Sequence, residues 1–251
     1  MLVLIGRLLK AKIVLPDGVV IGNEEGVPQG SPLSPLLSNI VLDELDWELG
    51  RRGHKFVRYA DDGNVYVRSE RAALNAFENL IGFIEGRLKL RVNRAKSAVA
   101  RPWDRKFLGF SFTPGPKIKR KIAPKALEKV KDRVRALTRP SNVSFPLLME
   151  RLRRYLTGWH AYFRFCQTPS ALADLWAWIC RRLRSLIWRQ WKCGRTRFAE
   201  LVKRGVYREK AAMTAGRSRG PWRQSRNPVL LWVFSPRWLI AQGLPKFHAS
   251  K

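Results

Sequence analysis

Residues 56–68 read FVRYADDGNVYVR, and this stretch decides the fold of the first half of the chain. Apolar and polar residues alternate on both sides of Asp61 and Asp62, as in two β-strands, and Asp62-Gly63 is a hairpin-turn signal. Two carboxylates at a hairpin tip can hold Mg²⁺, which prefers oxygen ligands and shares them with substrate phosphates. Two such ions can stabilise the attacking and leaving oxygens of a phosphoryl transfer.

The segment from Tyr59 to Asp62 also fits an ordinary solvated turn. Aspartate is common in turns because it tolerates unusual backbone angles and bonds its own backbone. A motif of four residues does not separate the two interpretations. The segments around the hairpin therefore have to decide between a metal site and a simple turn.

Those segments follow one another in a definite order. A helix is predicted over residues 2–11, a hairpin over 13–21 with Asp17-Gly18 at its tip, and a Gly/Pro loop over 26–35 in which Ser34 caps the next helix. That helix is expected to bury residues at helical spacing, namely Leu37, Ile40, Val41, Leu45 and Leu49. An amphipathic helix is predicted over 70–90, a strand pair over 106–112, and a linker over 113–116.

The charge of the chain is unevenly distributed. The formal net charge is +30, and residues 1–113 hold 17 Lys/Arg against 13 Asp/Glu, whereas residues 114–251 hold 32 against 6. Such an excess indicates a polyanionic partner. Eight of the ten Trp lie among the basic residues of 114–251, which favours nucleic acid, where phosphates give affinity and rings stack on bases. A membrane surface is the competing polyanion, but no apolar run of 18 residues predicts a spanning helix, and the first residues do not resemble a signal peptide.

The basic half is predicted to be helical. Helices are expected over 124–137, 145–166 and 170–191, with short helices over 196–215, a mobile or RNA-ordered loop over 216–227, and a short apolar segment over 228–244. Trp159, Trp176 and Trp178 are expected to pack in a core. The three cysteines, 13 and 14 residues apart, favour small buried residues in a reducing compartment over a zinc site.

The order of these motifs resembles the palm of a reverse transcriptase, and most of all that of group II intron-encoded proteins. The resemblance implies RNA-directed DNA polymerase ancestry, a Mg²⁺ cofactor and a catalytic, metal-binding pair in Asp61 and Asp62. It implies that Pro28, Gln29 and Gly30 contact template and nucleotide, that Asn93 and Lys96 form the motif that follows, and that Leu108-Gly109-Phe110 is similar to the primer grip. In chemical terms, Lys96 can neutralise a phosphate and Gly109 permits close approach of a strand.

The resemblance continues beyond residue 113. Residues 152–165, LRRYLTGWHAYFRF, look like the maturase (thumb) signature, residues 178–192 look like the helix after it, and residues 238–244 are similar to the family ending. The resemblance implies that this half binds group II intron RNA and that the partners include a DNA primer or target. Arginine can stack on bases and can bind a phosphate with two parallel hydrogen bonds. We therefore expect RNA contacts from the basic residues Arg153, Arg154, Arg181, Arg182, Arg184, Arg189 and Lys192.

The family palm also uses a third carboxylate on a strand before the Pro-Gln-Gly loop. Between Met1 and Gly26 the acids are Asp17, Glu24 and Glu25, and none lies in an apolar strand. We therefore expect an N-terminally truncated member that begins just after the first catalytic strand and is weak or inactive as a polymerase alone. The sequence leaves open whether a second chain supplies the missing strand, and it predicts uncovered apolar surface.

The sequence thus predicts an α+β fold, a partial reverse-transcriptase palm with an antiparallel sheet followed by an α-helical thumb/maturase domain. The expected ranges are 1–113 for the palm, 114–195 for the maturase domain and 196–251 for a basic C-terminal segment. A bacterial cytoplasmic ribonucleoprotein is the expected setting. A non-catalytic RNA-binding splicing factor stays open as the alternative, whereas a basic packaging or ribosome-associated protein would not explain the order of the palm motifs.

Overall fold

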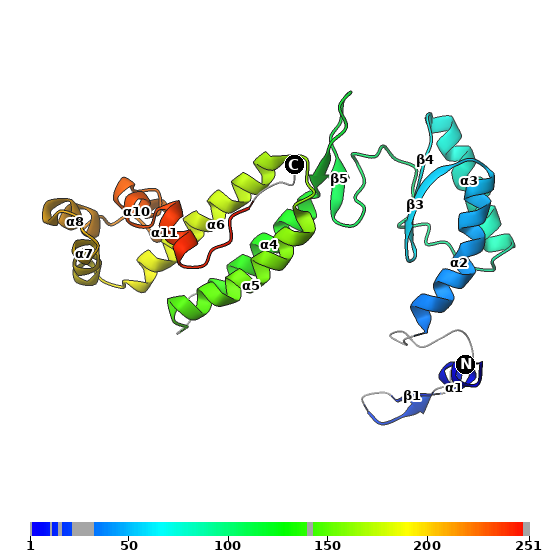
Figure 1. Ribbon diagram of the computed structural model, residues 1–251, viewed down its shortest axis with the longest axis horizontal. Helices are drawn as coiled ribbons and strands as arrows, with labels where there is room; N and C mark the ends of the chain where they lie inside the picture. The colour runs from blue at the N-terminus through cyan, green and yellow to red at the C-terminus, as the bar shows by residue number, and fades with distance from the viewer. Residues whose placement is uncertain (1, 11, 15–16, 22–32, 140–142, 248–251) are drawn as a thin grey trace. The chain divides into compact units, whose positions relative to one another are not determined.

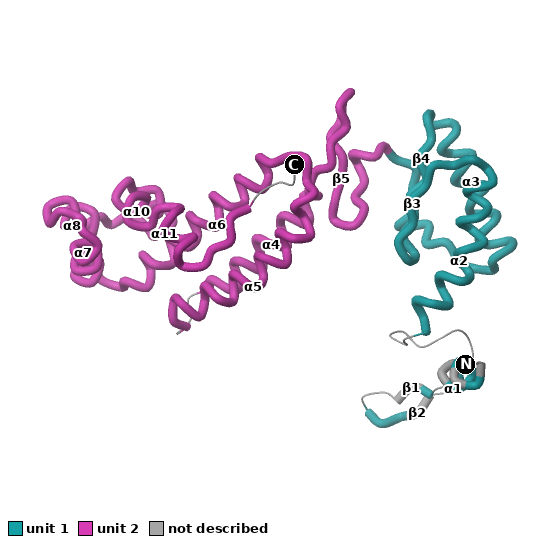
Figure 2. The backbone as a smooth tube through the Cα atoms, in the orientation of Figure 1, with its two compact units in different colours: residues 1–100 teal, residues 101–251 magenta. Residues whose placement is uncertain are grey.

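The computed structural model describes residues 2–10, 12–14, 17–21, 33–139 and 143–247. The chain divides into two compact units, residues 1–100 and 101–251 (Figure 2). The described part mixes helices with three two-stranded antiparallel sheets, so the α+β class is confirmed. None of the described helices is long and apolar enough to cross a membrane.

The first unit begins with a helix and a short hairpin. Helix α1 covers Leu2–Leu9 (Figure 1). Strands β1 (Ile13–Val14) and β2 (Val20–Ile21) are antiparallel, with Ile13 opposite Ile21. Gly18 has a φ of 85°, and the Asp17 carboxylate accepts a hydrogen bond from the Val19 amide at 3.3 Å. The predicted Asp17-Gly18 hairpin is confirmed, because this turn needs a left-handed residue and glycine supplies it.

The larger part of the first unit consists of two helices and a β-hairpin. It consists of α2 (Ser34–Arg51), β3 (Lys55–Tyr59), β4 (Asp62–Tyr66) and α3 (Glu70–Gly86). Helix α3 begins where the Ser69 hydroxyl accepts a hydrogen bond from the Ala72 amide at 3.2 Å, which satisfies one free donor of its first turn. Its buried residues are Ala76 and Ile81.

The predicted buried face of α2 is only partly right. Leu49 is buried, but Ile40 is 59% exposed and Val41 is 40% exposed. Leu36 and Trp47 on the same helix are exposed as well. The helix begins at Ser34 with Leu33 in the capping position, one residue earlier than predicted. Periodicity identified the helix, but it could not show how much of its apolar surface the described neighbours would cover.

The second unit opens with a hairpin that the sequence suggested was a linker. Strands β5 (Phe110–Phe112) and β6 (Arg120–Ile122) are antiparallel, with Phe112 opposite Arg120. Thr113 closes the connecting loop by donating its amide to the Lys119 carbonyl at 2.9 Å. The segment Thr113–Pro116 is therefore a hairpin loop within this unit, since Pro and Gly favour tight loops as well as linkers. The expected domain ranges 1–113, 114–195 and 196–251 stay predictions.

Helices build the rest of this unit around two hydrophobic cores and a smaller cluster under β6. The first core joins α4, α5 and α6 with the end of the chain, and half-buried Trp159, Trp176 and Trp178 pack against it as predicted. The second core joins the C-terminal end of α6 with the helices that follow. The helices are α4 (Pro124–Leu137), α5 (Phe145–Phe163), α6 (Pro169–Gln190), α7 (Gly194–Lys203), α8 (Arg208–Ala215), α9 (Pro221–Gln224), α10 (Pro228–Val233) and α11 (Pro236–Ala241).

The segment 216–227 is not the mobile loop that its composition suggested. It contains α9, and Gln224 is 1% exposed, with its Nε2 donating to the Thr214 carbonyl at 3.0 Å. The Arg181 guanidinium lies 3.9 Å from the Trp222 ring centroid. A buried amide and a stacked tryptophan fix this segment, and both contacts come from residues distant in sequence.

Candidate nucleic-acid interface and acidic hairpin

The acidic turn lies two positions earlier than its sequence signal. Tyr59 pairs with Asp62 and Arg58 pairs with Gly63, so the two-residue loop is Ala60-Asp61. Ala60 takes the left-handed conformation with a φ of 49°. Asp62-Gly63 was predicted as the turn, but both residues belong to β4, because the strand pairing set by Phe56 opposite Val65 overrides the local turn preference.

Arg58 fastens this turn to α2. Its Nε lies 2.8 Å from Asp46 Oδ1, and its Nη1 donates to Asn39 Oδ1 at 2.9 Å and to the Ala60 carbonyl at 3.1 Å. The hydrogen bond with Asp46 raises the pKa of the half-buried guanidinium, so the charge is retained. Arg58 thus holds the carbonyl next to the acidic pair at a set position relative to the helix.

The two carboxylates have different surroundings. Asp61 Oδ1 accepts a hydrogen bond from the Ser38 hydroxyl of α2 at 2.8 Å. Asp62 is paired with Tyr59, so its side chain shares the exposed face of the hairpin with Val57 and Tyr59. Both aspartates are exposed. Two solvent-facing carboxylates suit a hard divalent cation that keeps part of its water shell, so the residues present fit Mg²⁺ as two of its ligands.

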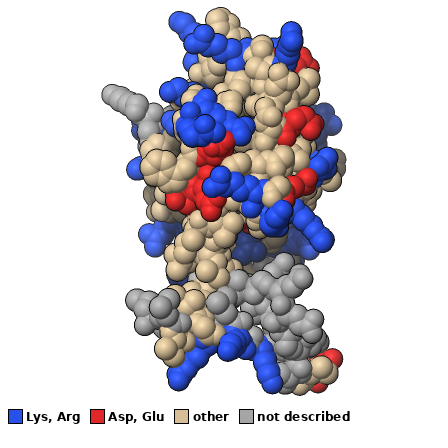
Figure 3. All heavy atoms as spheres, turned by 90° about the vertical axis from the view of Figure 1, so that its right-hand side faces the viewer, with Lys and Arg blue, Asp and Glu red and all other residues tan. Residues whose placement is uncertain are grey.

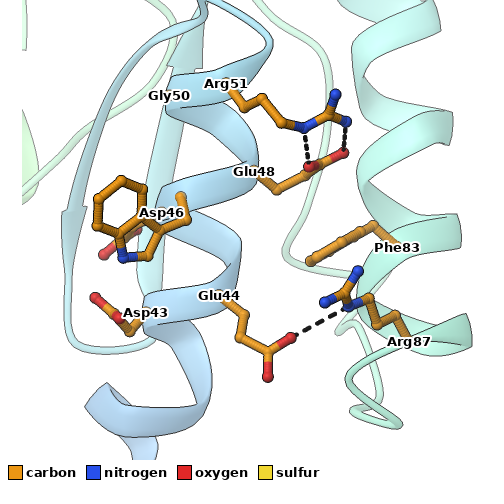
Figure 4. Close-up of a pocket in the computed structure, with 9 residues that line it drawn as sticks. Asp43, Glu44, Asp46, Glu48, Gly50, Arg51, Phe83 and Arg87 are labelled. Atoms are coloured by element: carbon orange, nitrogen blue, oxygen red, sulfur yellow. Dashed lines mark hydrogen bonds and ion pairs between the residues drawn. The ribbon is translucent and has the colours of Figure 1, made fainter.

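Several other acids of this unit are paired with arginines. A hollow of about 910 Å³ lies beside α2 and α3, and Glu44 and Glu48 point from α2 toward α3 (Figure 4). Glu44 binds Arg87 at 3.2 Å, and Glu48 binds Arg51 at 2.8 Å. On the face shown in Figure 3, acidic side chains likewise lie beside Lys and Arg. Among the described residues, no group of three or more His, Cys, Asp and Glu is arranged to hold a metal ion.

The Asn93-Lys96 motif forms a tight turn in the segment that follows α3. The Lys96 amide donates hydrogen bonds to two oxygens of Asn93, the backbone carbonyl at 3.0 Å and Oδ1 at 3.2 Å. Arg94 is tied to Glu85 of α3 at 2.9 Å. Asn93 therefore shapes the turn, and Lys96 is left exposed on it. The predicted contacts Pro28, Gln29 and Gly30 lie outside the described residues.

The segment that resembles a primer grip is a two-residue turn seated on α5. Leu108 and Gly109 have φ values of 50° and 78°, between Phe107 and Phe110, which exchange two hydrogen bonds of 2.9 Å. The Tyr162 hydroxyl donates to the Leu108 carbonyl at 2.9 Å. A Cβ on Gly109 would lie 3.0 Å from Cζ of Phe163. Glycine is thus required twice, for its backbone angle and for the close approach of the ring.

The seven predicted RNA contacts divide into exposed and enclosed groups. Arg153, Arg154, Arg189 and Lys192 are exposed. Arg181 and Arg182 are half-buried and engaged within the unit, Arg182 through a 2.9 Å hydrogen bond from its Nε to Thr138 Oγ1. Arg184 is only 6% exposed, so this side chain is enclosed within the unit, and its predicted RNA contact stays a prediction.

Two family models match separate parts of the chain. Residues 14–112 match the model for the reverse transcriptase (RNA-dependent DNA polymerase), and residues 127–205 match the model for the maturase-specific domain of group II introns. This chain belongs to the group II intron reverse transcriptase/maturase family. The Asp61-Asp62 hairpin lies within the first match, and α5 and α6 lie within the second.

Curated relatives are similar over shorter stretches. The chain is 34% identical to Protein YkfC of Escherichia coli (strain K12), over 30% of this chain and 29% of that protein. It is also 34% identical to the Retron Ec86 reverse transcriptase of Escherichia coli, over 30% of this chain and 25% of that protein. The chain therefore spans less than a third of each of these two relatives. Their similarity agrees with reverse transcriptase ancestry and leaves the activity of this family member to be proposed.

Sequence reasoning missed the residues that position the site. Ser38, Asn39 and Asp46 of α2 reach the acidic hairpin, but they are separated from it by 12 to 23 residues in sequence. One signal was present for Arg58, since it occupies an inward position of the alternating strand and a buried-side arginine requires a partner. Nothing in the local sequence identified Tyr162 as the residue that holds Leu108.

Proposed function

We propose that this chain binds group II intron RNA through its helical unit and assists folding of that RNA for splicing, as part of a ribonucleoprotein. The unbalanced charge of residues 114–251, 32 Lys/Arg against 6 Asp/Glu, is the observation that carries this proposal. The ion pairs found among the described residues of this part join neighbours on one helix, such as Arg154 with Glu150 at 2.6 Å. Most of its cations are therefore available to phosphates.

Arg189 and Lys192 are the strongest candidates for direct phosphate contact. Both are exposed, Arg189 in the last turn of α6 and Lys192 two residues after the helix ends, and both lie within the matched maturase range. Each phosphate contact releases counterions, so RNA affinity should fall as salt rises, with a slope of about 0.7 to 0.9 per contact. The double variant Arg189→Gln/Lys192→Gln should weaken binding and lower the slope of log K against log salt by about 1.5.

A matched variant shows whether position or only total charge matters. Arg71→Gln/Lys89→Gln removes the same charge from exposed positions of the first unit. We expect this variant to keep the salt slope of the unaltered chain, measured by fluorescence anisotropy with a structured intron RNA. Equal loss in both double variants would show that the helical unit carries no defined interface.

The acidic hairpin would bind divalent cations but support little DNA synthesis in this chain. Asp61 and Asp62 would hold the ion, which when bound supplies charge stabilisation for phosphoryl transfer. We expect little synthesis because the hairpin offers two carboxylates where the family resemblance implies three. In addition, one oxygen of Asp61 already accepts a hydrogen bond from Ser38. Primer extension with Mg²⁺ on an RNA template tests this expectation of weak synthesis. The variant is Asp61→Asn, and the control is Asp17→Asn, which alters the tip of the other hairpin. Robust synthesis lost only in Asp61→Asn would overturn the proposal of a weak polymerase.

A further inference from the structure

Four buried donor nitrogens on α6 and α7 lack acceptors. Within the described residues, Arg184 Nε and Nη1, Trp188 Nε1 and Arg197 Nε have no hydrogen-bond partner. Trp188 is fully buried, and Arg184 is 6% exposed. Buried donors are nearly always satisfied in proteins, because an orphaned one loses its hydrogen bonds to water without replacement. Several orphaned donors in one place point to a missing acceptor.

Arg184 lies in the most buried stretch of α6. Each residue from Leu183 to Trp188 is buried, and Arg184 keeps 6% of its surface exposed. Leu183 and Leu186 belong to one core, while Ile187 and Trp188 belong to the other. The guanidinium is therefore held where α6 passes between two apolar cores, a place where an unpaired charge is costly.

The orphaned donors gather around Trp188. Arg184 precedes it by one turn, so the two side chains lie on the same face of α6. Arg197 of α7 lies with its guanidinium carbon 4.7 Å from the Trp188 ring centroid. Arg204, the residue directly after α7, stacks in a similar way on Trp191 at 5.0 Å, but it also binds Glu200. The comparison shows the difference: Arg204 has an acidic partner, whereas no acidic side chain of the described residues pairs with Arg197.

No described side chain supplies an anion to this cluster. No ion pair joins Arg184 or Arg197 to an acidic residue of the described chain. Cys180 is one turn before Arg184, but burial raises the pKa of its thiol to about 12, so the thiol is neutral at pH 7. The cluster contains guanidinium and indole N–H groups, which donate and do not accept. Its chemistry therefore selects an oxyanion from outside the chain.

We propose that Arg184, Trp188 and Arg197 form a binding site for a phosphate group. The planar donor fork of arginine matches phosphate oxygens, and the two charges match a dianion. The phosphate can be an inorganic ion, or it can belong to bound RNA. Only the second source rests on the proposed RNA-binding function.

Thermal unfolding of the full chain in phosphate and in chloride at equal ionic strength tests the site. At a phosphate concentration ten times the dissociation constant, the midpoint of the unaltered chain should rise by about 3 °C over chloride. Arg184→Met should abolish this difference, and its midpoint in chloride should equal or exceed that of the unaltered chain. Arg197→Met, at a half-buried position, should reduce the difference and serves if Arg184→Met does not fold. Lys129→Met, which removes an exposed charge on α4, should keep it.

Equal phosphate effects in the unaltered chain, Arg184→Met and Arg197→Met would overturn the proposal, as would the absence of any effect beyond chloride. RNA binding then identifies the source. If the phosphate comes from RNA, Arg184→Met should weaken binding at least fivefold more than Lys129→Met, and inorganic phosphate should compete. If the ion is inorganic, the two variants should bind RNA alike. If the unaltered chain binds no RNA, the proposed function is refuted. The shift of the unfolding midpoint in phosphate would still show whether the phosphate site exists.

Discussion

Replacing Gly109 with alanine should destabilise the helical unit by about 2 to 4 kcal/mol. Gly109 has a φ of 78°, a left-handed conformation that costs a residue with a Cβ about 1 kcal/mol or slightly more. The new Cβ would lie 3.0 Å from Cζ of Phe163, and relieving such overpacking costs about 1 to 3 kcal/mol. Phe163 is 8% exposed and contacts the rings of Phe110 and Trp159, so it has little room to move.

Urea unfolding followed by tryptophan fluorescence measures this loss, because Trp159 lies on the helix that carries Phe163. Gly158→Ala is the matched control: it alters the same helix α5, at an exposed position where a new Cβ meets nothing within 4 Å. Alanine favours the helix there, so this variant should gain about 0.5 to 1 kcal/mol. Opposite signs for the two variants are expected. A Gly109→Ala protein within about 0.5 kcal/mol of the unaltered chain would refute the assigned turn geometry.

Two further predictions concern single polar groups. Thr138 is 1% exposed, and its hydroxyl accepts a hydrogen bond from Arg182 Nε at 2.9 Å. Thr138→Val should therefore lower the free energy of unfolding in urea by about 1 to 2 kcal/mol. A loss no larger than that of Thr157→Val, at an exposed position, would contradict this. Hydrogen bonds from Arg51 and Arg52 lower the pKa of Glu48 from 4.5 to about 2, so its stabilising effect should be complete above pH 4.5 and vanish as the pH falls toward 2. Titration of the Glu48 carboxyl carbon by NMR checks this, and a midpoint near 4.5 would show that the ion pairs do not form in solution.

Local sequence patterns predicted individual elements well. The helix over 124–137 was predicted to the residue, and those over 145–166 and 170–191 appear as Phe145–Phe163 and Pro169–Gln190. Apolar periodicity and prolines at helix starts are local signals, so they survive in the tertiary structure. The Asp17-Gly18 turn was equally readable, because its left-handed backbone angle favours glycine.

Local patterns failed where distant residues decide. The acidic turn moved from Asp62-Gly63 to Ala60-Asp61 because cross-strand pairing fixed the register. The segment 216–227 reads as a polar loop, yet Gln224 is buried against the Thr214 carbonyl. Arg184 reads as a surface cation on a basic helix, yet two cores enclose it.

The sequence by itself determined the helices, the order of the palm and maturase motifs, and the excess positive charge, because these depend on neighbouring residues and on composition. Only the tertiary structure decided which cations face water and which are enclosed, and which side chains hold the acidic hairpin. Burial and hydrogen bonding are relations between segments far apart in the chain, such as Arg58 with α2, so no local window of sequence contains them.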